Sequence, residues 1–135
     1  MKVLAVDFGI RRIGLAVGNS STRMATPLGQ IAAGNPRRVL DEIRRRIGEF
    51  EVERIVLGYP LNMDGSHGPA CAAVERFAAS LRKRIKLPVV LVDEKLSSVE
   101  AEEMGKEIEG DFRKRKAFLD SMAAKVILQT YFEQP

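Results

Sequence analysis

Residues 3–17 decide the fold class, and they read Val3-Leu4-Ala5-Val6-Asp7-Phe8-Gly9-Ile10-Arg11-Arg12-Ile13-Gly14-Leu15-Ala16-Val17. The apolar run at 3–8 predicts a buried strand, and the glycine and arginines of 9–12 predict a turn. Residues 13–18 return as a second strand, because apolar side chains occupy alternate positions there. The stretch therefore predicts a β-hairpin whose first strand ends in an acid.

The rest of the chain extends this hairpin into an α/β fold. A third strand is expected at 27–33, a fourth at 54–58 and a fifth at 89–92. Asn35-Pro36 is typical of a helix start, and a second helix is expected to open at Ser66 or Gly68. A short acidic helix is predicted at 97–108 and a final amphipathic helix at 116–132. Short connections favour antiparallel pairing and helical crossovers favour parallel pairing, so we expect a mixed five-stranded sheet flanked by helices.

Composition limits the classes of protein that need to be considered. The chain has 135 residues, of which 45% are hydrophobic and 30% charged, with a net charge of +4 and a single cysteine, Cys71. These values predict one globular domain over residues 1–135, with no disulfide, no membrane segment and a cytoplasmic location. The positive charge permits an acidic partner such as nucleic acid but does not require one.

Two carboxylates follow strands that should be buried. Asp7 ends the first strand, and Asp93-Glu94 follow the fifth. Sites in open α/β sheets gather beyond the carboxyl ends of strands, so Asp7 and Glu94 would converge if those strands are close neighbours. The alternatives are that Asp7 only caps its turn and that one of the later pair caps the next helix. We favour Glu94 over Asp93, because Ser97 already offers a helix cap.

Asp120 lies in the middle of the apolar stripe of the last predicted helix. At about 100° per residue, Ala124, Ile127 and Tyr131 fall within roughly 40° of it. An isolated charge in that position would be costly, so the alternative to a functional role is a buried pair with an arginine.

Three acids aimed at one place repel each other unless a cation neutralises them. Oxygen ligands with open positions suit Mg²⁺ or Mn²⁺, and one or two such ions can activate water against a phosphodiester. We therefore predict that Asp7, Glu94 and Asp120 are metal ligands and catalytic residues. Basic residues near them in the sequence could hold phosphates, with simple surface solubility as the alternative reading: Arg11, Arg12, Arg113, Lys114, Arg115 and Lys116.

Four segments together resemble the YqgF/RuvX family. They are residues 7–17, residues 58–65 (Gly-Tyr-Pro-Leu-Asn-Met-Asp-Gly), residues 93–98 (Asp-Glu-Lys-Leu-Ser-Ser) and residues 120–129. They occur in the family's order and span essentially the whole chain. Departures are Tyr59, where leucine is usual, Ser97-Ser98, where threonine is frequent, and Lys95, where arginine is common. A lysine at 95 still offers a phosphate contact but lacks the planar fork of an arginine.

The resemblance implies a ribonuclease H-like fold, a bacterial cytoplasmic protein, and Asp7, Glu94 and Asp120 as its catalytic acids. It also implies a metal-dependent nuclease that matures the 5′ end of pre-16S ribosomal RNA, with structured RNA as partner. Cleavage of Holliday junctions is the second reading, and branched DNA would favour a homodimer. A non-catalytic ribosome-assembly factor is the third reading. A fourth, nucleotide binding by the Asp-x-Gly turn as in sugar kinases, would need a second domain.

Overall fold

A computed structural model describes residues 1–62, 64–94 and 112–134, with the backbone alone described for 112–121. The strands are β1 (Lys2–Phe8), β2 (Arg12–Asn19), β3 (Met24–Ala32), β4 (Arg54–Tyr59) and β5 (Val89–Asp93). The helices are α1 (Pro36–Phe50), α2 (Pro69–Arg84) and α4 (Phe112–Glu133). Among these described helices, none is long and apolar enough to cross a bilayer.

The five strands form one mixed sheet in the order β3-β2-β1-β4-β5. The first three strands pair antiparallel through short turns, whereas β4 pairs parallel with both β1 and β5. Helical crossovers explain the parallel pairs, since a strand can return in the same direction only after a long connection. The predicted mixed five-stranded sheet flanked by helices is confirmed, and it places the carboxyl ends of β1, β4 and β5 side by side.

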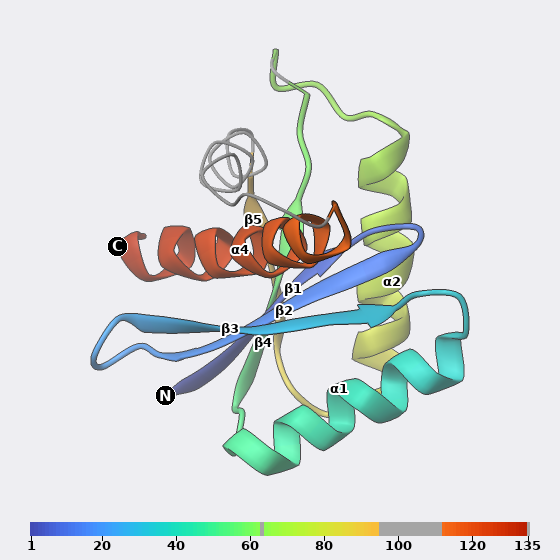
Figure 1. Cartoon of the computed structure of the whole chain (residues 1–135). Helices are drawn as coiled ribbons and strands as arrows, with labels where there is room; N and C mark the ends of the chain where they lie inside the picture. Colours follow the sequence, from blue (N-terminus) through green and yellow to red (C-terminus); the bar gives the residue numbers. More distant parts are fainter. Residues whose placement is uncertain (63, 95–111, 135) are drawn as a thin grey trace.

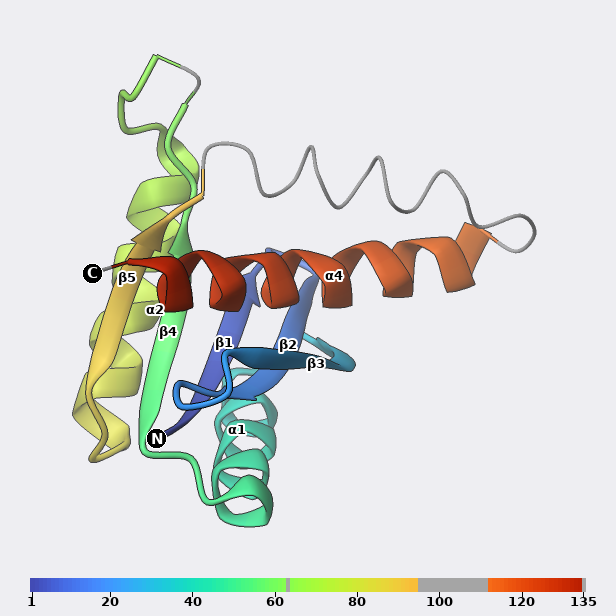
Figure 2. The ribbon, with the colours of Figure 1, turned by 90° about the vertical axis from the view of Figure 1, so that its left-hand side faces the viewer.

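Side chains alternate between the two faces of the sheet, and each face packs against different helices (Figures 1 and 2). On one face, even-numbered residues of β1 and odd-numbered residues of β2 pack with α1 and α2 in the larger core cluster. On the other face, Val3, Ala5 and Ala16 pack with Ala124 and Ile127 of α4. Position 7 continues the alternation of Val3 and Ala5, so Asp7 belongs to the α4 face.

The first crossover helix begins where the sequence predicted. Asn35 is the N-cap of α1, and its side-chain oxygen accepts hydrogen bonds from the backbone amides of Arg37 (3.1 Å) and Arg38 (3.3 Å). The helix ends at Phe50 and is followed by the C-cap residue Glu51, which adopts the left-handed conformation with φ 55°. Its buried side chains Val39, Leu40 and Ile43 lie at helical spacing and fix it to the sheet.

Two predicted boundaries were wrong. The third strand starts at Met24 rather than at residue 27, because Pro27 lies inside an edge strand, where a missing amide is tolerated. The register also shifts between Leu15 and Ala16, and Gly29 on the opposite strand has a φ of +88°. The last helix starts at Phe112, four residues earlier than predicted. The predicted acidic helix at 97–108 lies outside the described residues.

Candidate active site

Asp7 lies near the carboxyl end of β1, in the middle of the sheet. It is half-buried and pairs across the antiparallel ladder with Gly14 of β2. Val6 pairs with Leu57 of β4, so continuing that register by one residue places Asp7 beside Gly58. Glycines therefore occupy the positions on both sides of Asp7. Neither neighbouring strand places a side chain next to this carboxylate on the α4 face.

Glu94 follows β5 directly and is held at the same end of the sheet. Its backbone amide donates a hydrogen bond to the carbonyl oxygen of Tyr59, at 3.2 Å. Its carboxyl group lies over Gly58: a Cβ built on that glycine would be 2.6 Å from Glu94 Cδ and from Oε2. The same Cβ would be 2.5 Å from Ile127 Cδ1 of α4. The carboxylate of Glu94 therefore lies on the α4 face, between the sheet and the helix.

The two acids lie at nearby positions of the sheet because a single strand separates β1 from β5. Neighbouring strands lie about 4.8 Å apart, so the position above Gly58 is one strand spacing from Asp7. Asp7 and Glu94 therefore approach the same space on the α4 face. The antiparallel partner Gly14 lies on the far side of Asp7. This arrangement places both acids on the α4 face, and their shared role as metal ligands stays a prediction.

Asp93 has a different environment from Glu94. It pairs with Tyr59 in the parallel ladder and is exposed to solvent. Two residues earlier, Leu91 packs against the cluster under α1 and α2, so alternation places Asp93 on that face. Asp93 and Glu94 thus lie on opposite faces of the sheet, and the choice of Glu94 as the site residue stays a prediction.

Asp120 is a helical residue of α4, and its side chain lies outside the described part of the chain. Helical periodicity relates position 120 to Ala124 and Ile127, both of which are fully buried against the sheet. Among the residues with described side chains, no group of three or more His, Cys, Asp or Glu could hold a metal ion. Convergence of Asp120 with Asp7 and Glu94 stays a prediction.

The predicted phosphate-binding residues divide into those with described side chains and those without. Arg11 is exposed in the turn after β1, and Arg12 is half-buried at the start of β2, on the α4 face by alternation with Gly14 and Ala16. The sequence placed Lys114 and Arg115 ahead of the last helix and Lys116 at its start; all three instead occupy the first turns of α4, and their side chains are not described. Lys95 lies outside the described residues.

A polar network supports the segment that follows β4. The hydroxyl of Tyr59 donates to Glu75 Oε1 of α2 at 2.6 Å and lies 3.2 Å from His67 Nδ1. The hydrogen bond to Glu75, followed by burial, raises the pKa of Tyr59 above its usual range. Cys71 Sγ donates to the carbonyl oxygen of Pro60 at 3.3 Å, so this cysteine is a buried structural residue. The network fixes Tyr59, whose carbonyl in turn holds Glu94.

Sequence reasoning missed the importance of Gly58 and Gly14. Gly58 stands inside an apolar strand, which often marks a close approach by another group. Here the approaching groups are the carboxyl of Glu94 and the side chain of Ile127. The signal was visible in the sequence, but the identity of the approaching groups depends on how α4 docks.

Solved structures with the same arrangement of elements include two Holliday junction enzymes. The fowlpox virus resolvase with its junction DNA superposes with a TM-score of 0.55 over 99% of this chain and 100% of that one, at 10% identity. RuvC of Thermus thermophilus in complex with a Holliday junction substrate gives 0.50, over 91% of each chain at 15% identity. The arrangement of elements is therefore a ribonuclease H-like fold.

Comparison of sequences narrows the class to one family. The RuvX family, described as Holliday junction resolvase, matches residues 1–134, and the chain belongs to it. A protein of Chloroflexus aggregans is 41% identical over 97% of this chain and 92% of its own length, and one of Geobacillus kaustophilus is 42% identical over 98% of both. Both carry the name "Putative pre-16S rRNA nuclease".

Proposed function

We propose that this protein is a divalent-metal-dependent nuclease that hydrolyses phosphodiester bonds in the 5′-end maturation of pre-16S ribosomal RNA. The observation that carries the proposal is the approach of Asp7 and Glu94 to one space on the α4 face. The full-length relatives named for pre-16S rRNA support RNA as the substrate. Ribosomal RNA maturation would place the protein in the bacterial cytoplasm, with residues 1–135 acting as one nuclease domain.

The donor set fits a hard cation. Carboxylate oxygens are the ligands that Mg²⁺ and Mn²⁺ prefer, and adjacent acids in a half-buried site are stabilised by a positive ion. Asp7, Glu94 and Asp120 are the residues that would hold one or two ions. When bound, such an ion supplies Lewis-acid polarisation of a phosphoryl oxygen and a water of lowered pKa.

The chain's own residues would bind and orient the substrate. Arg11 lies in the turn after β1 and Arg12 begins β2, and both can neutralise phosphates flanking the bond that is cut. Glycine at 58 leaves the place beside Asp7 to the carboxyl group of Glu94 and the side chain of Ile127, instead of to a side chain of β4. We extend phosphate binding to Lys95, Lys114, Arg115 and Lys116, whose basic side chains neighbour the two other proposed ligands in sequence.

A cleavage assay tests the proposal. Purified protein is incubated with pre-16S RNA carrying its 5′ leader, with Mg²⁺, Mn²⁺ or chelator. We expect cleavage that needs metal and that falls at least ~100-fold in Asp7→Asn and in Glu94→Gln, since each change removes a charged ligand. Asp93→Asn is the matched control, because it makes the same kind of change on the opposite face. Equal cleavage by Glu94→Gln and the unchanged protein would contradict the catalytic proposal and favour a non-catalytic assembly factor.

Cleavage of a four-way DNA junction is the second candidate, favoured by the junction-bound resolvases that share the fold. The same assay with a DNA junction in place of RNA separates the two substrates. A junction enzyme would act as a homodimer, because two symmetric cuts are made, so sedimentation with and without the junction accompanies the assay. A monomer that cuts RNA and leaves the junction intact would eliminate this candidate.

A further inference from the structure

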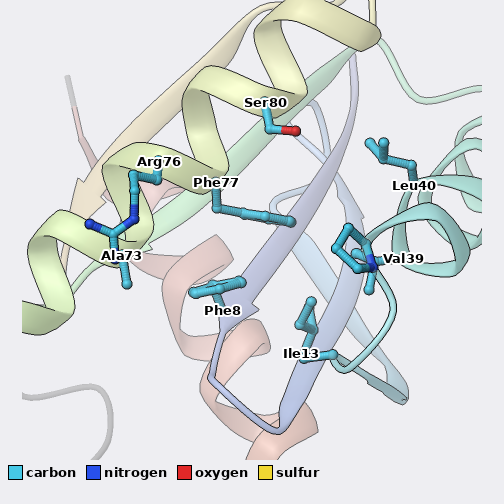
Figure 3. A pocket seen from close by; sticks show the side chains of 10 residues that line it. Phe8, Ile13, Val39, Leu40, Ala73, Arg76, Phe77 and Ser80 are labelled. Atoms are coloured by element: carbon cyan, nitrogen blue, oxygen red, sulfur yellow. The ribbon is translucent and has the colours of Figure 1, made fainter.

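A second surface lies on the face of the sheet away from Asp7 and Glu94. A groove of about 310 Å³ runs between α1 and α2 above the carboxyl end of β1 and the start of β2. Figure 3 shows the side chains of Phe8, Ile13, Val39 and Phe77 facing it from these elements. Phe8 and Phe77 stack with ring centroids 4.6 Å apart and planes 24° apart. We call this part the apolar groove.

The apolar groove is continuous with a neighbouring hollow that is lined by basic side chains. This hollow, of about 680 Å³, shares Pro36, Leu40 and Ser80 with the apolar groove. Its other lining residues include Arg37, Arg44 and Arg84, and Arg76 lines the apolar part. The only acid that lines either part, within the described chain, is Asp41. The surface therefore joins an apolar floor to a positively charged rim.

The polar groups of the apolar groove indicate what it can hold. Only Arg76 and Ser80 offer polar side chains there, and neither is a carboxylate or a carboxamide. The edge of a nucleobase carries donors and acceptors together, and this lining would leave most of them without partners. A large apolar side chain loses nothing in the same place and gains burial against Phe8 and Phe77. The adjoining arginines then favour carboxylates on the same ligand.

We propose that this surface, between α1 and α2, binds an acidic peptide segment of a partner protein that inserts a large apolar residue into the apolar groove. Carboxylates next to that residue reach Arg37, Arg44 and Arg84, while Arg76 covers the inserted side chain. The surface is separated from the candidate active site by the full thickness of the sheet. A partner bound here leaves the α4 face open to nucleic acid.

The absence of tryptophan from the chain makes a direct test simple. The probe is a synthetic twelve-residue peptide with Trp and Leu four positions apart among Asp and Glu, so all indole emission comes from the peptide. We expect a saturable blue shift on titration with the folded, full-length protein. A peptide with every acid changed to Gln should bind at least ~10-fold more weakly, because the rim then has no charge to neutralise.

Neighbouring arginines of α1 provide a matched pair of variants. Arg37→Glu reverses a charge that lines the surface, and Arg38→Glu makes the same change one residue away, outside the lining. Both residues are exposed in the first turn of α1, where an acid is compatible with the helix dipole. We expect Arg37→Glu and Arg76→Glu to weaken peptide binding at least ~10-fold and Arg38→Glu to leave it within twofold.

Three outcomes would overturn the proposal. The first is no change in emission up to millimolar protein, and the second is equal weakening by Arg37→Glu and Arg38→Glu, which would mean general charge attraction. The third is a single-stranded RNA that displaces the peptide and loses affinity equally in Arg76→Glu, which would assign the surface to nucleic acid. Cleavage of pre-16S RNA by Arg37→Glu is measured in parallel; because the surfaces differ, its result reports on the nuclease alone.

Discussion

The carboxyl group of Glu94 occupies the place where any residue other than glycine at position 58 would carry its Cβ. The distances from that Cβ to Glu94 Cδ and Oε2 would both be 2.6 Å, and the distance to Ile127 Cδ1 would be 2.5 Å. These values are too short for ordinary contacts, so a side chain at 58 forces Glu94, Ile127 or both to move. The position of Glu94, a proposed metal ligand, thus depends on position 58 of the neighbouring strand having no side chain.

Gly58→Ala should therefore damage both stability and activity. We expect a loss of about 1–3 kcal/mol in the free energy of unfolding, as for other overpacked sites, and at least ~10-fold slower cleavage. Gly48→Ala is the control, because nothing lies within 4 Å of a Cβ there and helix α1 favours alanine. That change should stabilise by about 0.5–1 kcal/mol. Urea unfolding and the RNA assay measure both, and equal stability of the two variants would contradict the packing described.

Metal binding should stabilise the folded protein if Asp7 and Glu94 share an ion. At a free Mg²⁺ concentration of about 100 times the dissociation constant, the gain is about 2.7 kcal/mol, which raises the melting temperature by about 10 °C. Asp7→Asn and Glu94→Gln should lose this gain, because each variant removes one oxygen ligand with its charge. Differential scanning calorimetry with Mg²⁺ and with chelator makes the comparison.

Asp41→Asn is the control for the metal experiment, because Asp41 is an exposed acid of α1 on the other side of the sheet. It should keep the full gain in melting temperature. If Glu94→Gln keeps that gain as well, stabilisation comes from ions at the surface and the proposed site is wrong.

Hydrophobic periodicity was sufficient to predict the architecture. It did not predict the local irregularities of the strands. The alternation of Ile13, Leu15 and Val17 sets which face of β2 is buried, and that constraint fixes the register of the hairpin. The start of β3 escaped prediction because Pro27 usually ends a strand, and only its edge position makes it acceptable. Strand propensity alone cannot distinguish an edge from a central strand.

The positions of Asp7 and Glu94 in the candidate site were predictable, because both residues lie at the ends of strands. Asp7 and Glu94 follow apolar runs, and parallel topology brings those ends together. The role of Gly58 was not predictable, since it arises only when Ile127 of α4 docks onto β4 beside Glu94. The groove between α1 and α2 was also invisible, because helix spacing depends on side chains from several distant segments.

Removing the N-cap of α1 should destabilise the protein by about 1 kcal/mol. Asn35 satisfies the amides of Arg37 and Arg38, and alanine cannot replace either hydrogen bond. Asn35→Asp should retain most of the stability, because its carboxylate accepts the same bonds and suits the positive end of the helix dipole. Chemical denaturation at neutral pH compares the three proteins. An alanine variant as stable as the aspartate variant would show that the cap contributes nothing.

The hydroxyl of Tyr59 should contribute a pH-dependent part of the stability. It donates to Glu75, and it must be neutral to do so. Its pKa is raised above the ordinary value of 10.0, chiefly by that hydrogen bond and then by burial. A raised pKa in the folded state means that the contribution is complete below about pH 10 and is lost as the pH rises through the higher, folded-state value. Stability should therefore fall in alkaline solution partly through this one group.

The Tyr59→Phe variant isolates that effect. Its melting temperature should be about 2–5 °C lower than that of the unchanged protein between roughly pH 7.5 and 9, because the bond to Glu75 is missing. Above about pH 10 the difference should shrink, since the hydroxyl of Tyr59 then ionises in the unfolded chain while it stays protonated in the folded one, which favours unfolding of the unchanged protein alone. All other groups are the same in the two proteins and cancel in the comparison. A difference in melting temperature that stays constant up to pH 11 would show that the hydroxyl of Tyr59 makes no titrating contribution, and that its contact with Glu75 does not hold the β4 end in place.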